Sequence, residues 1–459
     1  MMDTARREYE TARQIAEAVS PLGGTAYLVG GCVRDRLRGA ETKDIDLEVH
    51  GISPEKLEKI LDSFGDRITI GESFGIYSLK GLSLDIAMPR KEKCLGRGHR
   101  DFAVSVDPFI GTYGAAMRRD FTVNALMENV LTGEITDHFG GRKDLECGIL
   151  RHVNTDTFGE DPLRVLRAAQ FAARFGFSVA EETLSLCQSM DLSSLARERV
   201  MAELEKALLQ AAHPSVFFET LRKMNQLHGW FPELSALIGV PQNPRFHAEG
   251  DVWIHTMMVV DEAAPMKNRT IRPDGFMLAA LSHDFGKAVC TETVSGEIHA
   301  YGHESLGIPL AEAFLNRLTA EQNLRDYVLS LVRYHMVPNI LAEHRSAVRK
   351  TNRLYDSVPD PEALIFLAEA DARGKIPPWE NPERTSFLLE RLKTYRETME
   401  RPYVTGKDLI DAGIQPCEQF RDYLSYAHKL RLAGIKRENA LRETLAYIRR
   451  HPGTPPDES

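Results

Sequence analysis

The stretch LVGGCVRDRLRGAETKDIDLEV, residues 28–49, decides how the first part of the chain is organised. An apolar segment runs into Gly30 and Gly31, a helix-like segment follows, and a second apolar segment carries Asp44 and Asp46. Residues two apart on a strand point to the same face, so these two carboxylates are expected to project together. Paired hard-oxygen ligands beside a glycine turn suit Mg²⁺ and a phosphate chain. A surface strand with two solvated aspartates would explain the same residues.

Length and composition indicate an ordinary globular protein with several domains. A chain of 459 residues is too long for one hydrophobic core, so about two to four domains are expected. No apolar run of about 18 residues could span a bilayer, and the N-terminus lacks the apolar core of a secretory signal. Six cysteines without a C-x-x-C pair fit reduced thiols, so a cytoplasmic protein without membrane association is expected.

Charge is unevenly spread along the chain. The net charge of −9 argues mildly against a nucleic-acid partner, but binding depends on local basic patches. Residues 421–450 carry eight Lys and Arg against three acidic residues. Such a run is either a solvated helix face or a tail that binds a nucleic-acid backbone.

Hydrophobic periodicity predicts an α+β head followed by a helical body. A helix is expected at residues 4–20, and from Asp161 onward the pattern is helical almost to the end. The polar, glycine-containing segment 91–100 predicts a mobile loop. Short strands are expected at residues 27–29, 45–49, 68–70, 77–79, 82–86, 104–106 and 134–137.

Asp85 is a third acid, placed in the middle of the apolar segment 84–87. A metal-assisted phosphoryl-transfer site usually needs a further carboxylate to activate the attacking hydroxyl, and Asp85 is the candidate. A solvated position on an exposed strand face would also account for it.

The segment RRDFTVNAL, residues 118–126, places two adjacent arginines where a helix is expected to begin. Guanidinium groups bind phosphate bidentately, so Arg118 and Arg119 suit a triphosphate. An ion pair with Asp120 at the helix start is the other interpretation.

Asp161 and Pro162 open a helix that continues through Phe175. An aspartate N-cap followed by proline would by itself explain this acid. However, Asp161, Arg164, Arg167 and Arg174 recur at helical spacing and share one face. Together they offer acceptors and donors that could hydrogen-bond a base edge.

These blocks together resemble the class II CCA-adding tRNA nucleotidyltransferases. The resemblance rests on GGCVRD at 30–35, DID at 44–46, RRDFTVNAL at 118–126, EDPLRVLR at 160–167 and RERVMAEL at 197–204. It implies a nucleotidyltransferase-type head with a small mixed sheet, followed by an all-helical body. It also implies template-independent addition and repair of the 3′-terminal CCA of tRNA from CTP and ATP, with release of pyrophosphate.

The resemblance further implies a role for each matching residue. Asp44 and Asp46 would hold Mg²⁺, and the tRNA 3′-hydroxyl would attack the α-phosphate. The triphosphate would be bound by Gly30, Gly31 and Arg34, with Arg118 or Arg119 assisting. Asp161 and Arg164 would read the base edge, with Arg167 alongside.

The helical half carries a second constellation, which resembles the HD phosphohydrolase superfamily. It consists of His255, the segment LAALSHDFGK at 278–287 with His283 and Asp284, and the distant Asp371. Histidine and carboxylate ligands suit a divalent transition metal such as Ni²⁺ or Mn²⁺. The resemblance implies phosphatase and 2′,3′-cyclic phosphodiesterase activity, whereas a lone His-Asp pair would be structural. His303, Glu304 and His335 could bind substrate phosphate.

The sequence therefore suggests four parts and leaves several alternatives open. The parts are a catalytic head (1–150), a helical neck for base recognition (151–240), an HD domain (241–375) and a helical tail with possible tRNA contact (376–459). A bacterial poly(A) polymerase and a CC-only or A-only enzyme are rivals within the class. A metal phosphohydrolase with an RNA-binding head is the rival from another class, and the protein is expected to be a monomer or homodimer.

Overall fold

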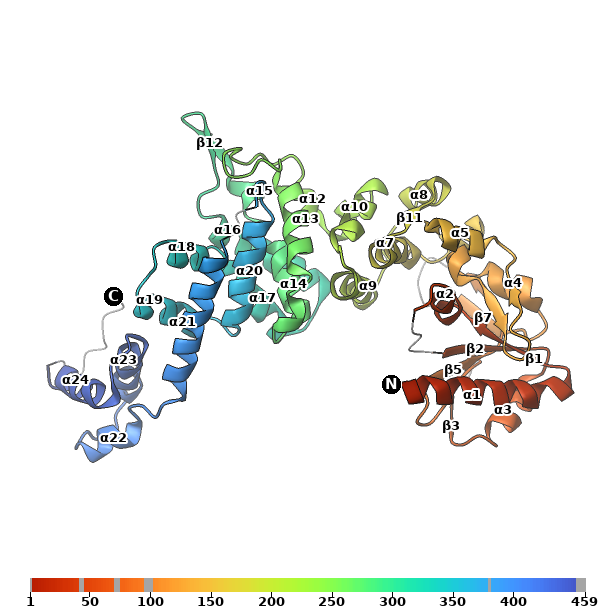
Figure 1. Ribbon diagram of the computed structural model, residues 1–459, viewed down its shortest axis with the longest axis horizontal. Coiled ribbons are helices and arrows are strands. Elements are labelled where there is room, and N and C mark those ends of the chain that lie inside the picture. The colour runs from red at the N-terminus through yellow and green to blue at the C-terminus, as the bar shows by residue number, and fades with distance from the viewer. Residues whose placement is uncertain (1, 41–44, 70–74, 95–101, 379–380, 451–459) are drawn as a thin grey trace. The chain divides into compact units, whose positions relative to one another are not determined.

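The computed structural model describes residues 2–40, 45–69, 75–94, 102–378 and 381–450 (Figure 1). The chain divides into two compact units, Met1–Ala211 with Val216–Trp230, and Ala212–Ser215 with Phe231–Ser459. The four-part division remains a prediction. None of the helices in the described ranges is both long and apolar enough to cross a membrane.

The first unit is built on a mixed seven-stranded sheet in the order β3-β4-β5-β2-β1-β8-β9. Strands β2 and β5 run parallel, and the other neighbouring pairs are antiparallel. The strands are β1 (Thr25–Val29), β2 (Ile45–His50), β3 (Arg67–Thr69), β4 (Ile76–Leu79), β5 (Leu84–Ala87), β8 (Met127–Asn129) and β9 (Ile135–Thr136). This confirms the α+β head expected from the sequence.

Hydrophobic and acidic residues alternate along the first part of β2, so they point to opposite faces of the sheet. Ile45, Leu47 and Val49 are buried in a core with residues of α1 (Met2–Val19) and α3 (Pro54–Leu61). Successive side chains of a strand point to opposite faces, so Asp46 and Glu48 project from the other side. The hydrophobic face thus fixes the direction of the acidic residues.

Two local predictions in the head are wrong. No helix begins at Arg118, because α4 (Gly111–Met117) ends there and a 3₁₀ turn (Thr122–Asn124) leads into β8, which pairs with β1. The expected loop at 91–100 instead begins with strand β6 (Arg90–Cys94), which forms a hairpin with β7 (Phe102–Val106). Residues 95–101 of that segment lie outside the described part of the chain.

Helices complete the first unit around the sheet. α7 (Leu163–Phe175) packs on α9 (Arg197–Gln210), and Leu166 of α7 and Leu204 of α9 are both buried. A short parallel pair, β10 (Ile149–Leu150) and β11 (Ser178–Val179), interrupts the helical pattern. The helices are α2 (Gly31–Leu37), α5 (Gly141–Cys147), α6 (Thr155–Gly159), α7 (Leu163–Phe175), α8 (Glu181–Gln188), α9 (Arg197–Gln210), α10 (Ser215–Lys223), whose first residue belongs to the second unit, and α11 (Leu227–Trp230).

In the described part of the second unit, the strands form one hairpin, β12 (Glu292–Val294) with β13 (Glu297–His299), and the other elements are helices. Its central helix α14 is buried on all sides from Gly275 to Ser282 and packs against α13, α17 and α20. The helices are α12 (Pro232–Ser235), α13 (Val252–Ala263), α14 (Pro273–Ser282), α15 (Lys287–Cys290), α16 (His303–Leu318), α17 (Gln322–Tyr334), α18 (Val337–Glu343), α19 (Val348–Asp356), α20 (Pro361–Arg373), α21 (Pro382–Glu400), α22 (Gly406–Asp411), α23 (Phe420–Leu432) and α24 (Arg437–Arg450).

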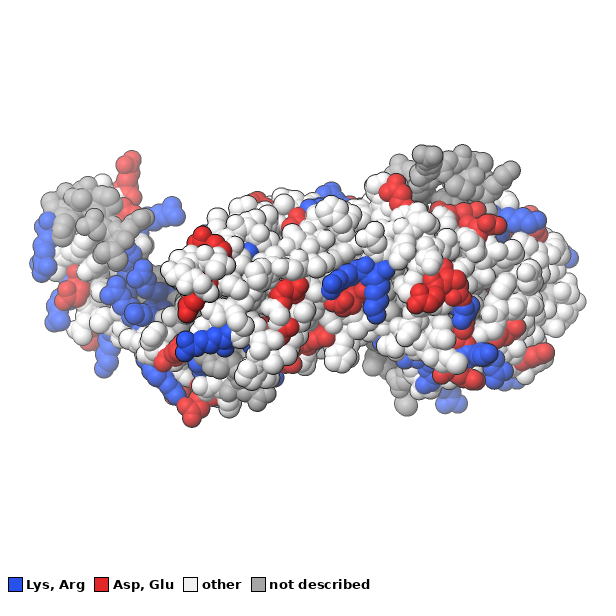
Figure 2. Space-filling model, turned by 90° about the horizontal axis from the view of Figure 1, so that it is seen from above, with Lys and Arg blue, Asp and Glu red and all other residues white. Residues whose placement is uncertain are grey.

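The last three helices have a small core of their own around Leu409, Tyr423 and Ile448. Lys and Arg side chains are prominent on the lobe that these helices form (Figure 2). The basic run of residues 421–450 is therefore helical, and many of its charges lie at the surface.

Candidate active site and candidate metal centre

A cavity of about 500 Å³ opens in the first unit beside the turn between β1 and α2. Eight arginines contribute to its wall, so it is suited to a polyanion. Every nucleotide-binding residue predicted from the sequence reaches it. The cavity is lined by Gly30, Gly31, Arg34, Asp46, Arg90, Arg118, Arg119, Asp120, Asn124, Asp161, Leu163, Arg164, Arg167, Gln170, Phe171, Arg174, Arg199 and Lys206.

Gly30 allows the side chains of Asp46 and Arg119 to lie close to the backbone at this turn. Its φ of +70° and ψ of −133° form a conformation that other residues rarely adopt. A Cβ atom built on Gly30 would lie 3.5 Å from Oδ2 of Asp46 and 3.5 Å from Nη1 of Arg119. A glycine at this turn therefore leaves space for a ligand between the carboxylate and the guanidinium.

The three predicted catalytic acids are placed as follows. Asp44 lies outside the described residues. Asp46 on β2 is in register with Asp85 on the parallel neighbour β5, so both side chains project from the same face of the sheet. Asp46 lines the cavity, whereas Asp85 is exposed and lies outside the lining.

Arg34 is held by several partners at once. Its Nε and Nη2 donate to the two carboxylate oxygens of Asp35 at 2.8 and 2.9 Å, and its Nη1 donates to Oδ1 of Asn124 at 2.6 Å. The guanidinium carbon lies 4.4 Å from the ring centroid of Phe175. Only 4% of the residue is exposed, so its orientation is fixed by the protein.

Arg118 and Arg119 converge on the buried carboxylate of Glu48. Their Nη2 atoms donate to the same oxygen, Oε2, at 3.0 and 3.1 Å, and His50 Nε2 lies 3.0 Å from Oε1. Burial by itself would raise the pKa of Glu48. The hydrogen bond from His50 and the charges of the two arginines outweigh burial and lower this pKa to about 2.

The predicted base-reading residues lie together at the start of α7. Asp161 accepts two hydrogen bonds from Arg199, at 3.3 and 3.0 Å, and one from the backbone N–H of Leu163. The N-cap position itself is Pro162 rather than Asp161. Arg164 donates to the carbonyls of Thr157 and Arg118 at 2.8 and 2.6 Å. Both side chains are therefore oriented within the cavity wall.

Asp120 forms its ion pair with Arg167 of α7, whereas the helix-start interpretation paired it with the adjacent arginines. Nε and Nη2 of Arg167 lie 2.8 and 2.6 Å from Oδ2 of Asp120, and Asn124 donates to Oδ1. Burial opposes ionisation of Asp120, but the charge of Arg167 outweighs it and lowers the pKa of Asp120. This pair ties α7 to the segment after α4.

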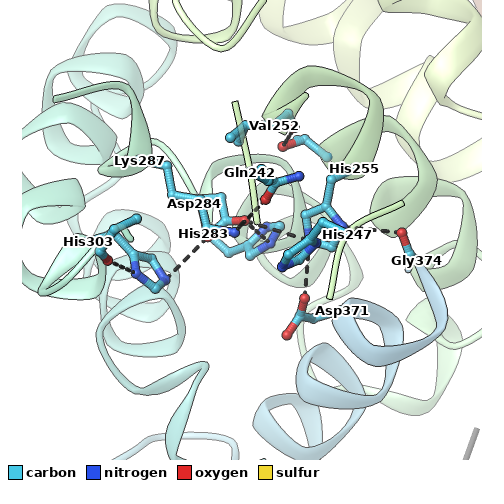
Figure 3. A network of polar contacts seen from close by, with 12 residues as sticks. Gln242, His247, Val252, His255, His283, Asp284, Lys287, His303, Asp371 and Gly374 are labelled. Carbon is cyan, nitrogen blue, oxygen red and sulfur yellow. Dashed lines mark hydrogen bonds and ion pairs between the residues drawn. The ribbon is translucent and has the colours of Figure 1, made fainter. Parts of the chain in front are cut away.

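The second constellation lies at the end of α14 in the second unit (Figure 3). His255 Nε2 lies 3.1 Å from Oδ1 of Asp371 and 3.6 Å from Oδ2 of Asp284, and His283 Nε2 lies 3.2 Å from that same Oδ2. All four residues are at most 4% exposed. Nε2 of His283 is buried without a well-formed hydrogen bond, as expected of an atom that binds a cation. Oδ2 of Asp284 lies 2.7 Å from Nζ of Lys287 and is ion-paired with it.

Two further histidines face the other oxygen of Asp284. His303 Nε2 and His335 Nε2 lie 3.3 and 3.9 Å from Oδ1, and only 3.3 Å from each other. Nδ1 of His303 and Nδ1 of His335 lie 2.9 and 2.7 Å from the carbonyls of Ala300 and Val332. Their Nδ1 atoms therefore act as donors, which leaves Nε2 as the acceptor. Burial and neighbouring His283 lower the pKa of His335 to about 3, so it is neutral at physiological pH.

Among the described residues, ligand-forming atoms fall into three groups: the triads His255–His283–Asp371 and Asp284–His303–His335, and the set His247–Glu249–His255. In the third group, Oε1 of Glu249 lies 3.0 Å from Nδ1 of His255 and 2.7 Å from Nδ1 of His247. Nδ1 of His255 also lies 3.1 Å from the carbonyl oxygen of Gly374. The adjoining pocket, about 250 Å³, is also lined by Lys287 and Lys375. Glu304 is not among its lining residues.

Several site residues escaped the sequence reasoning. Glu48, Asn124, Arg199 and Glu249 hold predicted residues in place from elsewhere in the chain. Asn124 and Arg199 lie within the motifs at residues 118–126 and 197–204, so their place in those motifs was a signal that could have identified them. Glu48 and Glu249 lie two residues after Asp46 and six before His255, and no spacing rule assigns them a partner.

Comparison with known proteins places both halves in one family. Residues 26–151 match the poly A polymerase head domain, and residues 176–238 match the probable RNA and SrmB-binding site of polymerase A. The multifunctional CCA protein of Pasteurella multocida is 35% identical over 429 residues, covering 90% of this chain and 97% of that protein. That of Methylococcus capsulatus is 36% identical over 445 residues, covering 93% and 98%.

Solved structures agree in fold. The Thermotoga maritima CCA-adding enzyme complexed with tRNA has a TM-score of 0.64 at 22% identity, covering 96% of this chain and 95% of that one. The Bacillus stearothermophilus CCA-adding enzyme in complex with CTP has a TM-score of 0.67 at 20% identity, covering 96% and 98%. With relatives above 30% identity along nearly their whole length, this chain belongs to the multifunctional CCA protein family.

Proposed function

We propose that this protein adds and repairs the 3′-terminal CCA of tRNA without a nucleic-acid template, using CTP and ATP and releasing pyrophosphate. The observation that carries the proposal is one cavity that combines Asp46, an arginine-lined wall and the pair Asp161–Arg164. The relatives of similar length are named multifunctional CCA proteins, and a related fold is described in complex with CTP. This favours CCA addition over a poly(A) polymerase.

We propose that this site binds Mg²⁺. Asp46 presents a carboxylate oxygen beside the Gly30 turn, and Asp85 stands in register with it, so the donors are the hard oxygens that Mg²⁺ prefers. Asp44 and Asp46 would hold the ion, with Asp85 as the residue proposed to activate the hydroxyl. When bound, Mg²⁺ would neutralise phosphate charge and favour ionisation of the attacking 3′-hydroxyl.

Different side chains would bind the triphosphate and the base of the nucleotide. Arg34, Arg118 and Arg119 would bind the triphosphate, because their guanidinium groups line the wall near the glycine turn. Cytosine and adenine each present an amino donor beside a ring-nitrogen acceptor. Asp161 can accept from the amino group and Arg164 can donate to the ring nitrogen, with Arg167 held alongside by Asp120.

Primer extension tests this proposal. Purified protein is offered tRNAs that end before CCA, after C and after CC, with CTP and ATP supplied separately and together. Stepwise addition of C, C and A that disappears in Asp46→Ala is the expected result. Long ATP-only runs would indicate a poly(A) polymerase, and arrest after CC, or addition of A alone, would indicate a partial enzyme. Failure on every substrate would overturn the proposal.

We also propose that the second unit is a metal-dependent phosphohydrolase of the HD type, acting on phosphate monoesters and 2′,3′-cyclic phosphates. The supporting observations are the triads His255–His283–Asp371 and Asp284–His303–His335, and the buried Nε2 of His283, which makes no well-formed hydrogen bond. Imidazole and carboxylate donors suit Ni²⁺ or Mn²⁺, and the triads offer ligands for up to two ions. When bound, such an ion would polarise the phosphate, while Lys287 and Lys375 offer positive charge to it.

Hydrolysis of a 2′,3′-cyclic nucleotide with added Ni²⁺ or Mn²⁺ tests the second site. Release should vanish in His283→Ala, while CCA addition by the same variant continues. Activity that persists in His283→Ala would contradict the metal assignment. If hydrolysis were present and CCA addition absent, the chain would be a phosphohydrolase with an RNA-binding head.

A further inference from the structure

Glu48 is a buried carboxylate beside the cavity that the proposed reaction does not use. It projects from the same face of β2 as Asp46, is 1% exposed, and lies outside the cavity lining. Its Oε2 atom accepts from both Arg118 and Arg119 at 3.0 and 3.1 Å. Its second oxygen faces His50. One carboxylate thus contacts two cavity arginines that are adjacent in sequence.

The charges explain why the arginines need such a partner. Two guanidinium groups on neighbouring residues repel each other, and a shared anionic oxygen offsets that repulsion. The two side chains remain 19% and 24% exposed, so neither is withdrawn into the core. Nη1 of Arg119 reaches the Gly30 turn, where a Cβ would lie 3.5 Å away. Arg118 and Arg119 can therefore form ion pairs with Glu48 and still line the cavity.

We propose that Glu48 is a positioning residue that fixes Arg118 and Arg119 for the triphosphate and thereby sets affinity for nucleotide and pyrophosphate without touching either. The inference rests on the proposed nucleotidyl transfer. Base choice should not depend on Glu48. Glu48 contacts the guanidinium of Arg118, whereas Arg164 is oriented by the backbone carbonyls of Thr157 and Arg118, and Asp161 is oriented by Arg199. Loss of Glu48 should weaken CTP and ATP binding equally.

The test compares Glu48→Gln with a matched control, Glu128→Gln. Glu128 on β8 is also 1% exposed and ion-paired, but its partner Arg36 does not line the cavity. Glu48→Gln is expected to raise KM for CTP and for ATP about tenfold, with kcat changed less and the CTP-to-ATP preference unchanged. Glu128→Gln should leave KM unchanged. An unchanged or lowered KM in Glu48→Gln overturns the inference.

A double-mutant cycle separates positioning from general destabilisation. In an Arg118→Ala, Arg119→Ala background, Glu48→Gln should have no further effect on KM, whereas additive effects would contradict the inference. Should Glu48→Gln not fold, Glu48→Asp keeps the charge with a shorter reach and is expected to raise KM by a smaller factor. An unchanged KM in Glu48→Asp would then overturn the inference.

Binding of inorganic tripolyphosphate, measured by calorimetry without tRNA, needs no catalysis. It should weaken about tenfold in Glu48→Gln and stay unchanged in Glu128→Gln. If binding shifts in this way while the wild type extends no tRNA, the proposed function fails and the positioning role stands. If the wild type extends tRNA and binding does not shift, only the positioning role fails.

Discussion

The guanidinium of Arg34 is fixed on several sides within the protein. Asp35 contacts it through both carboxylate oxygens, Asn124 accepts a third hydrogen bond, and Phe175 stacks on it. An arginine that is already ordered loses little side-chain entropy when a phosphate arrives. Rigid placement is therefore part of its binding function in the proposed site.

Arg34→Lys should weaken nucleotide binding although it keeps the charge. A single ammonium group can neither pair with both oxygens of Asp35 nor stack as a plane on Phe175. We expect KM for both nucleotides to rise roughly tenfold to a hundredfold. Arg38→Lys is the control, since Arg38 also stacks on Phe175 at 4.4 Å but is exposed outside the cavity. Equal effects of the two substitutions in steady-state kinetics would contradict this account.

Cys187 on α8 should make the protein sensitive to alkali. Burial raises the pKa of its thiol from 9.0 to about 12. Below pH 9 the thiol is neutral in both states; above pH 9 only the unfolded chain ionises, so stability is lost between about pH 9 and 12. The expected slope is about 1.4 kcal/mol per pH unit.

Denaturant unfolding between pH 8 and 10.5 measures this loss. Cys187→Ala should be less stable than the wild type at pH 8 because of the cavity it creates, but the difference should shrink above pH 9. A constant difference over that range would show that the thiol does not titrate as described.

At the scale of elements, the turn that follows the His-Asp pair is held by a close helix contact. A Cβ built on Gly286 would lie 2.8 Å from the carbonyl carbon of His303 and 2.7 Å from the backbone nitrogen of Gly307, both on α16. The φ of Gly286 is −62°, so the glycine is needed for close packing and not for its backbone conformation. α16 can only approach Asp284 this closely because position 286 has no side chain.

Gly286→Ala should therefore displace α16 and move His303 away from Asp284. Hydrolysis of a 2′,3′-cyclic nucleotide is expected to fall by at least tenfold, because small displacements of metal ligands are costly. CCA addition should be unaffected. Gly229→Ala is the control, since a Cβ there would meet open space. Full hydrolytic activity in Gly286→Ala would contradict the proposed role of this contact.

Features formed by residues close together in the sequence could be predicted, whereas features formed by residues far apart in the sequence could not. Alternation along β2 and the 3.6-residue spacing of Asp161, Arg164, Arg167 and Arg174 are local signals, and the structure places all four of the latter in one cavity. The helix predicted to begin at Arg118 is absent, because the 3₁₀ turn that follows leads into strand β8, which is defined by its pairing with β1. This pairing joins Met127 to Val29, which lies far earlier in the sequence. The hydrogen bond between Arg34 and Asn124 likewise spans 90 positions.

The same limit applied to the sites. The metal-type residues of the second unit stand in recognisable spacing, but Glu249 meets His255 through a loop that no periodicity describes. The two triads around Asp284 depend on the packing of α14, α16 and α17. Motifs indicated candidate residues for the two sites, whereas the side chains that orient these candidates became visible only in three dimensions.

At the scale of the whole molecule, the two candidate sites lie in different compact units of the chain. The arginine-lined cavity belongs to the first unit, and the histidine triads belong to the second. Ligand binding stabilises the part of a protein that folds around it. A metal ion bound at the triads should therefore protect one unit selectively.

Adding Ni²⁺ to chelator-treated protein should stabilise the second unit and leave the first unit unchanged. Nε2 of His303 and Nε2 of His335 lie 3.3 Å apart, so one cation could bind both. At a free concentration one hundred times Kd, the gain is about 2.7 kcal/mol, or roughly 5–10 °C for a unit of this size.

Amide hydrogen exchange locates the Ni²⁺ effect. Slower exchange should be confined to α13, α14, α16, α17 and α20, the helices that carry or adjoin the triads. It should be lost in His283→Ala and weakened in His335→Ala, whereas Asp46→Asn should keep it. Protection spread over both units, or retained in His283→Ala, would place the ion elsewhere and refute the triads as its ligands.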